Sequence, residues 1–150
     1  GPIPEPLGVR WARKGLMYRG AIVTRRVPAR TLLDVLRNSA STPVENTLRK
    51  AGAAIRHMHD FGIAHADLQL KNILVSDDSI WLIDFDRSQR VPSLGNARRC
   101  SNLLRLRRSF EKQALSLDNF ATLLAAYGAI EIPRWIDWVY RFRGLTARYR

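Results

Sequence analysis

The sequence has almost no cysteine and no long apolar run, and these two absences exclude several kinds of protein. Cys100 is the only cysteine among 150 residues, which excludes an internal disulfide and a cysteine-based zinc site and favours a reducing compartment such as the cytosol. The most extended apolar stretch, residues 120–130, is interrupted by Tyr127 and Gly128 and is shorter than the roughly 20 residues of a membrane-spanning helix. A hydrophobic content of 46% nevertheless predicts one domain with a buried core.

Acidic residues are also scarce, and they are unevenly distributed. The chain has 25 basic and 13 acidic residues, so its net charge is +12, which is typical of proteins that meet nucleic acid, anionic lipid or sugar phosphates. Six of the acids lie between Asp60 and Asp86, where Lys71 is the only base. Clustered carboxylates repel one another unless a cation neutralises them, so this segment indicates a metal site. Asp77 and Asp78 are the exceptions, because their position predicts simple turn formers.

The first part of the chain predicts short strands and one short helix. Three prolines make residues 1–9 an extended connector, and because the sequence opens on this connector we expect it to be part of a longer protein. Residues 10–13 and 16–24 are β-prone segments around a Lys14-Gly15 turn, and residues 31–37 are predicted to form a helix.

The clearest helical pattern follows that short helix. Thr42-Pro43-Val44-Glu45 forms a capping box with proline at the first helical position, and apolar residues then recur on one face until Gly62 ends the helix. His57 and His59, two residues apart, do not face the same side of a helix, so we expect histidines at the surface or facing the C-terminal helix dipole rather than a metal pair. Further helices are predicted at residues 98–110, at residues 115–127, and from Pro133 through Trp135, Trp138 and Phe142.

The segment from His65 to Asp86 carries the residues best suited to chemistry. Its apolar runs, residues 73–75 and 80–83, predict two strands of a short hairpin joined by a polar turn. Antiparallel pairing of these strands brings Asn72 and Asp84 together, beside Asp67 on the loop that precedes the hairpin. An amide and a carboxylate that converge next to a second carboxylate suit a divalent metal ion and a phosphoryl acceptor.

This spacing resembles the catalytic and metal-binding loops of the protein-kinase-like fold. His65-x-Asp67-Leu68-x3-Asn72 matches the motif H-R-D-L-x-x-x-N, and Asp84-Phe85-Asp86 matches D-F-G. Ala66 replaces the arginine and Asp86 the glycine, and both departures point away from regulated protein kinases and toward kinases of small molecules or lipids. The fold implied is α+β, mostly the helical large lobe of a kinase with a short catalytic β-hairpin.

More narrowly, the chain is similar to the 3-deoxy-D-manno-octulosonic acid (Kdo) kinases of the lipopolysaccharide core kinase family. The stretches that carry the similarity are Gly15-Leu16-x-Tyr18-Arg19, His65–Leu68, Asn72–Leu74, Ile83–Arg87 and Asn102–Ser109. The resemblance implies ATP-dependent phosphorylation of a Kdo hydroxyl on Kdo-lipid A. It also implies a peripheral position on the cytoplasmic face of a Gram-negative inner membrane, with an anionic membrane surface as partner and no nucleic acid.

The resemblance also assigns roles to the site residues. Asp67 is expected to accept or orient the proton of the attacking hydroxyl, while Asn72 and Asp84 are expected to hold Mg²⁺ beside the ATP phosphates. Lys71 is a candidate for neutralising the transferring phosphate, although the usual kinase lysine stands where this chain has Gln69. For Asp86 two roles stay open, support of the metal or an ion pair with Arg87.

Two parts of a kinase do not occur before Arg10. The sequence there has no Gly-x-Gly-x-x-Gly loop and no lysine on a predicted strand, and both would grip ATP. Residues 1–29 are therefore expected to be a remnant of the small-lobe strands and the hinge, and residues 30–150 the large, catalytic lobe. We expect the 150-residue chain to bind Mg-ATP weakly and to turn over slowly or not at all.

The basic helices leave alternatives open. Five arginines interleaved with leucines are predicted to contact the phosphates of lipid A or an anionic membrane: Arg98, Arg99, Arg105, Arg107 and Arg108. The alternative for such a helix is an ordinary solvated face, which we favour for the helix after Pro133. At the level of function, the alternatives to a Kdo kinase are another small-molecule kinase of the same fold and a non-catalytic kinase-like module that binds anionic lipid or nucleic acid.

Overall fold

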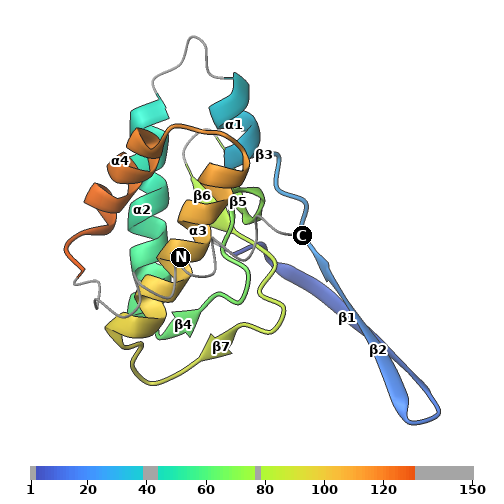
Figure 1. Ribbon diagram of the computed structural model, residues 1–150. Helices are drawn as coiled ribbons and strands as arrows, with labels where there is room; N and C mark the ends of the chain where they lie inside the picture. Colours follow the sequence, from blue (N-terminus) through green and yellow to red (C-terminus); the bar gives the residue numbers. More distant parts are fainter. Residues whose placement is uncertain (1–2, 39–43, 77–78, 131–150) are drawn as a thin grey trace, which may run out of the picture.

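The computed structural model describes residues 3–38, 44–76 and 79–130 (Figure 1). In chain order the elements are β1 (Pro6–Lys14), β2 (Met17–Thr24), β3 (Arg30–Thr31), α1 (Leu32–Asn38), α2 (Val44–Asp60), β4 (Ile63–Ala64), the 3-10 helix η1 (Leu70–Asn72), β5 (Ile73–Val75), β6 (Ile80–Leu82), β7 (Gln89–Arg90), α3 (Asn96–Lys112) and α4 (Leu117–Tyr127). The predicted capping residues Thr42 and Pro43, the turn at Asp77-Asp78 and the helix from Pro133 lie outside the described residues. Among the described residues, no helix is both long and apolar enough to span a membrane.

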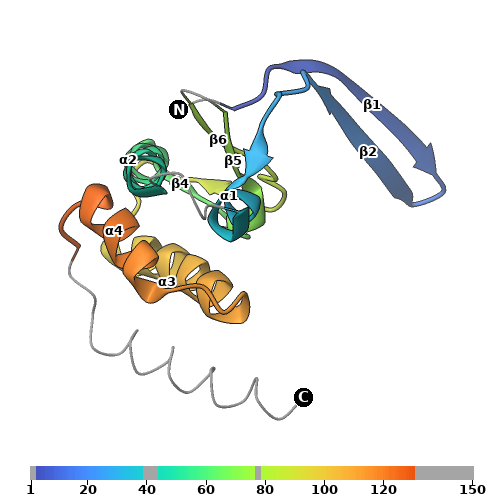
Figure 2. The ribbon, with the colours of Figure 1, turned by 90° about the horizontal axis from the view of Figure 1, so that it is seen from above.

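The core forms where α2 packs against α4, which lie side by side in both views of the ribbon (Figures 1 and 2). The predicted apolar face of α2 is confirmed, because Leu48, Ala51, Ile55 and Met58 are all buried. Gly52 lets the two helices approach closely: a Cβ atom at this position would lie 2.2 Å from the carbonyl oxygen of Leu123. The helix pair therefore depends on a residue without a side chain at its centre.

The predicted catalytic hairpin is confirmed, with β5 and β6 paired antiparallel in the register Ile73↔Leu82. The structure adds strands that the sequence did not predict: β3 extends this sheet on the β5 edge, and β4 pairs with β7. Each of the three has only two residues, which is too short for an alternating apolar pattern to be visible. The β4–β7 pair brackets the chain on both sides of the hairpin and so helps to fix the loops at its ends.

Strands β1 and β2 form a separate antiparallel hairpin that projects away from the helices (Figures 1 and 2). The expectation of an extended connector up to residue 9 is wrong from Pro6 onward, because β1 begins there. Proline is tolerated as the first residue of an edge strand, where its missing N–H is not needed. Beyond the pair, the backbone N–H of Arg25 donates to the carbonyl of Glu5 at 2.8 Å, which prolongs the ladder to the base of the hairpin.

Of the positions expected for the histidines of α2, the surface position is confirmed for His57 and wrong for His59. His57 is exposed, but His59 is fully buried. The C-terminal end of α2 is covered by α3 and α4, and both helices supply a hydrogen-bond partner for the His59 ring, Asn102 and Tyr127. A polar side chain can be buried at this position because its partners are buried with it.

Candidate active site

The loop between β4 and β5 contains Asp67 and is folded around the ring of His65. The backbone N–H of Asp67 donates to Nδ1 of His65 at 3.1 Å, and Nε2 of the same ring lies 3.0 Å from the carbonyl oxygen of Ile83, just past β6. The Phe85 ring packs on the imidazole with centroids 4.8 Å apart. One buried side chain thus ties the Asp67 loop to the segment that carries Asp84.

These contacts fix the protonation state of His65. A backbone N–H can only donate and a carbonyl can only accept, so Nδ1 must be unprotonated and Nε2 must carry the hydrogen. Burial lowers the pKa of His65, which favours the same neutral form. A second proton on this ring would remove the acceptor that holds the Asp67 backbone, and neutrality is therefore part of the loop geometry.

Helix α3 holds the same loop from the other side, through residues spaced three and four apart on one helical face. Asn102 Oδ1 accepts from the backbone N–H of His65 at 2.8 Å, and Ser109 Oγ accepts from the backbone N–H of Leu70 at 3.0 Å. Between them, Nη1 of Arg105 lies 3.9 Å from Oδ1 of Asp67. Sequence reasoning gave Asn102 and Ser109 no role; their spacing with Arg105 was the available signal.

The Asp67 carboxylate is oriented but not enclosed. Its Oδ2 accepts from Nε2 of Gln69 at 2.6 Å, and its side chain is 51% exposed. A carboxylate held in one direction and open to solvent can receive a proton from a hydroxyl group placed before it. The geometry is thus compatible with the proton-accepting role predicted from the sequence.

Asn72 and Asp84 lie at the open end of the β5–β6 hairpin, where the predicted metal site was placed. The backbone N–H of Ile83 donates to the carbonyl of Asn72 at 3.1 Å, which continues the ladder one step beyond the strands. Asp84 follows immediately, exposed, with φ of +63°, a left-handed conformation that aspartate tolerates better than most residues. This turn directs the chain away from the ladder at the predicted metal ligand.

The donor set at this end fits a hard divalent cation. Nδ2 of the buried Asn72 donates to the carbonyl of Asp67 at 2.8 Å, so the amide is fixed and its oxygen is the atom left to face a cation. Within residues 3–38, 44–76 and 79–130 no cluster of three or more His, Cys, Asp or Glu side chains is close enough to hold a metal. Mg²⁺ does not need such a cage, because it is commonly bound by one or two carboxylates together with substrate phosphates.

The two weaker candidates among the predicted site residues are Lys71 and Asp86, and both are exposed. Lys71 is exposed in η1, one residue before Asn72. Asp86 lies 3.9 Å from Arg87, and both side chains are more than four-fifths exposed, so this ion pair contributes little to stability.

The five predicted arginines of α3 do not form one surface. Arg105 faces Asp67, whereas Arg99 is only 16% exposed and makes a 2.6 Å ion pair with Asp60 at the end of α2. Arg107 pairs with Glu111 one turn later. Of the other two, Arg98 is exposed and Arg108 is half-buried. The basic helix is thus divided between structural pairs and the edge of the candidate site.

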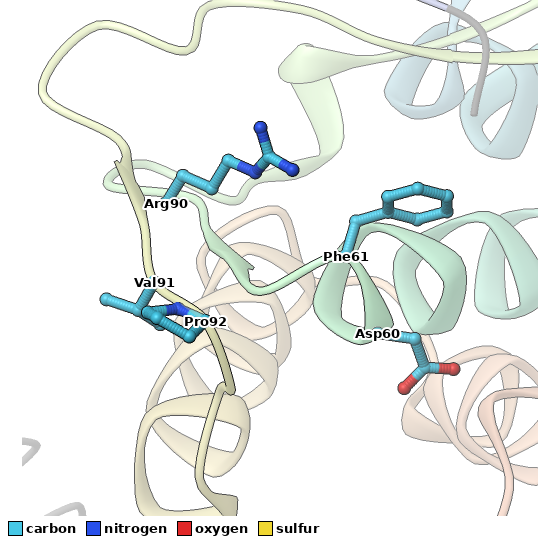
Figure 3. A pocket seen from close by; sticks show the side chains of 5 residues that line it. All are labelled: Asp60, Phe61, Arg90, Val91 and Pro92. Carbon is cyan, nitrogen blue, oxygen red and sulfur yellow. The ribbon is translucent and has the colours of Figure 1, made fainter.

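Two hollows formed by described residues lie outside this site. An open depression of about 520 Å³ is lined by Asp60, Phe61, Arg90, Val91 and Pro92 at the end of α2, as Figure 3 shows. A smaller, apolar pocket of about 200 Å³ has Phe85, Leu82 and Met58 in its wall. None of Asp67, Asn72 and Asp84 lines either hollow, so we locate the candidate site from its side-chain chemistry and not from cavity size.

Comparison with known proteins agrees with this geometry. Residues 2–127 match the model of the lipopolysaccharide kinase (Kdo/WaaP) family. The chain belongs to the lipopolysaccharide kinase family. The predicted family and the predicted kinase-like α+β fold are both confirmed.

Individual members of the lipopolysaccharide kinase family show how much of the chain is shared. A 3-deoxy-D-manno-octulosonic acid kinase of Vibrio cholerae is 38% identical over 130 residues, which are 81% of this chain and 53% of that protein. One of Haemophilus influenzae is 35% identical over 138 residues, 84% of this chain and 56% of that protein. The chain therefore spans about half the length of the curated relatives it matches.

A solved structure, described as WaaP in complex with acyl carrier protein, shares the fold. It superposes with a TM-score of 0.67 at 17% identity, and the match covers 97% of this chain and 65% of that one. At this identity the similarity establishes the fold alone. The chain therefore shares the fold of the part of that structure that it matches.

Proposed function

We propose that this chain carries the catalytic loop of a kinase that transfers the terminal phosphate of ATP to a hydroxyl of Kdo on Kdo-lipid A. The observation that carries the proposal is the position of the Asp67 carboxylate. It is oriented by Gln69 and Arg105 and joined through its backbone to Asn72, next to the turn of Asp84. The curated relatives that are named Kdo kinases, at 32–38% identity, support the choice of acceptor.

In this proposal Asp67 receives the proton of the attacking sugar hydroxyl as the sugar oxygen bonds to the γ-phosphorus, while the bond from that phosphorus to the β–γ bridging oxygen breaks and ADP leaves. Gln69 keeps one carboxylate oxygen engaged, so the other oxygen, which faces Arg105, is the one directed at the acceptor. Asn72 and Asp84 would hold Mg²⁺, which supplies positive charge to the nucleotide phosphates when bound. Arg105, which lies beside Asp67, and the exposed Lys71 would attract the phosphate groups.

The division of the chain follows from the same proposal. Residues 1–29, with the projecting β1–β2 hairpin and the segment after it, would belong to the small lobe and hinge. Residues from 30 onward would form the large lobe, whose core is made by α1, α2, α3, α4 and the β5–β6 hairpin. Support comes from Figure 1, where the β1–β2 hairpin lies apart from the helices.

The proposed place of action is the cytoplasmic face of a Gram-negative inner membrane, where the protein would bind peripherally. The net charge of +12 supports this, because a basic residue near an anionic surface contributes about 1 kcal/mol to binding. We expect vesicles containing anionic lipid to bind the protein more strongly than neutral vesicles, and the difference to diminish with added salt. Flotation that is equal for the two kinds of vesicle would contradict the membrane proposal without affecting the catalytic one.

The decisive experiment measures phosphate transfer from labelled ATP to purified Kdo-lipid A. It uses the protein at the full length that its gene encodes. Asp67→Asn keeps the side-chain shape and removes the base, so we expect the rate to fall by about 10²- to 10⁴-fold. Asp34→Asn, the same change on the exposed face of α1, is the matched control and should retain full activity. Equal rates for the Asp67→Asn variant and the unmodified protein would refute the proposed role.

A further inference from the structure

We infer that His59, a buried histidine of α2 that touches no reacting group, is a positioning residue that holds the Asp67 loop in place through Asn102. The ring lies in the core between α2, α3 and α4, and nothing in the proposed reaction requires it. As far as it concerns catalysis, the inference rests on the proposed function. As far as it concerns the loop, it rests on hydrogen bonds alone.

The contacts form one continuous chain from α4 to the loop. The Tyr127 hydroxyl lies 2.9 Å from Nδ1 of His59, and Nε2 of His59 lies 3.2 Å from Oδ1 of Asn102. That same oxygen accepts the backbone N–H of His65 at 2.8 Å, and the His65 ring in turn accepts the backbone N–H of Asp67. Four side chains from three helices and the loop are thus connected in series.

The backbone N–H of His65 determines which group donates and which accepts in each of these hydrogen bonds. The His65 backbone N–H can only donate, so the Asn102 atom in front of it is the amide oxygen. Nε2 of His59 faces that oxygen as well and must therefore donate its hydrogen to it. Nδ1 of His59 is then unprotonated and accepts from the Tyr127 hydroxyl. His59 has a single tautomer that satisfies every neighbour.

The surroundings of the ring keep it neutral. It is fully buried, and the charged groups around it are Arg99, Arg56 and Asp60, two cations and one anion. Burial is the main cause that lowers its pKa to about 4, and the two arginines act in the same direction. A neutral ring can donate to Asn102 and accept from Tyr127 at once, whereas a protonated ring would lose the second bond.

Packing alone does not require a histidine here. A leucine would fill a similar volume, but it would leave the Tyr127 hydroxyl without this acceptor and Asn102 Oδ1 with one donor instead of two. The Asn102 amide would then be free to rotate about its last torsion and release the His65 N–H. His59 is suited to this position because it can bridge two buried polar groups.

The test compares His59→Leu with His59→Gln in the full chain. A glutamine amide reaches about as far as Nε2 and can still donate to Asn102, so it serves as the conservative variant. The readout is native-state hydrogen exchange of the His65 and Asp67 amides, which needs no substrate. We expect His59→Leu to accelerate their exchange about tenfold relative to buried amides of α2, the effect of losing one hydrogen bond, and His59→Gln to keep it near the original rate.

The control for general destabilisation is Leu123→Ala on α4, a buried change that removes no hydrogen bond of the chain. It should accelerate the loop amides and the α2 amides equally. A loop exchange rate that responds no more to His59→Leu than to Leu123→Ala would overturn the inference.

Two further measurements separate positioning from folding and from the proposed reaction. Nitrogen NMR should show the His59 ring neutral with hydrogen on Nε2; hydrogen on Nδ1 would overturn the inference even if His59→Leu failed to fold. In the transfer assay, kcat should fall about tenfold in His59→Leu and recover in His59→Gln, with the KM for ATP unchanged. If the exchange data agree but no phosphate is transferred by any form, the proposed function fails and the positioning role stands.

Discussion

The β1–β2 hairpin and the helical body, by which we mean the described residues from 30 to 130, follow opposite patterns of burial. In the body, four polar side chains are buried in or beside the core, His59, His65, Asn72 and Asn102, and within the described residues no buried side-chain nitrogen or oxygen lacks a hydrogen-bond partner. In the hairpin, large apolar side chains are exposed instead, with Trp11 at 72% and Leu16 at 98%. The body contains buried polar groups with partners, whereas the hairpin exposes apolar groups that the described residues do not cover.

This contrast shows which interactions hold each region. Val9, Trp11 and Ile22 lie on one face of the hairpin, while Arg10 and Arg19 lie on the other face. Its strands are held mainly by their backbone ladder, and a two-stranded hairpin is marginally stable alone. The body has side-chain packing and a polar network that reaches the Asp67 loop. Stability and loop geometry should therefore respond to changes in the body and hardly at all to changes in the hairpin.

The largest effect is expected from adding one methyl group to each region. Gly52→Ala would place Cβ 2.2 Å from the carbonyl oxygen of Leu123, so α2 and α4 must separate, and we expect the free energy of unfolding to fall by about 3 kcal/mol. Gly20→Ala in β2 meets nothing within 4 Å and should change it by less than about 0.5 kcal/mol. Urea denaturation of both variants measures the difference. Similar losses would show that the hairpin and the body fold as one tightly coupled unit.

The sequence predicted the parts of the fold whose signals are local. The apolar spacing of α2, the strands β5 and β6 and the motif around Asp67, Asn72 and Asp84 could all be read from neighbouring residues. The two-residue strands β3, β4 and β7 were missed, because pairing with a distant strand, and not their own pattern, defines them. The first strand of the β1–β2 hairpin was predicted too short, because the prolines before it suggested a connector.

The sequence predicted the reactive residues of the candidate site but not the residues that hold its loop in place. Asn102 and Ser109 are about 35 to 40 residues from the loop amides whose hydrogen bonds they accept, and their spacing with Arg105 indicates a shared helical face but not the loop that it contacts. His59 was expected at the surface because its helical neighbours gave no sign of the two helices that cover it. Arg99 looked like part of a basic face, whereas Asp60, 39 residues away, pairs with it. Buried polar groups are determined by tertiary partners, which a periodic pattern does not reveal.

A smaller effect is expected from acid, and it should again come from the body. The pKa of His59 is lowered from 6.5 to about 4 by burial, so between these values the unfolded chain binds a proton that the folded chain does not. Stability from this group is therefore complete above pH 6.5 and is lost as the pH falls toward 4. The loss between pH 8 and pH 5 amounts to about 2 kcal/mol. His65, whose pKa burial also lowers, acts in the same direction.

Denaturant unfolding of the unmodified chain and of His59→Gln at pH 8 and pH 5 isolates this contribution. Glutamine does not titrate, so the variant should lose about 2 kcal/mol less than the unmodified chain over the same interval, because other groups contribute equally to both. His57→Gln, which replaces the exposed histidine of the same helix, is the control variant. Equal acid sensitivity in all three proteins would mean that the neutral His59 ring does not stabilise the body, and the contrast with the hairpin would then rest on apolar packing alone.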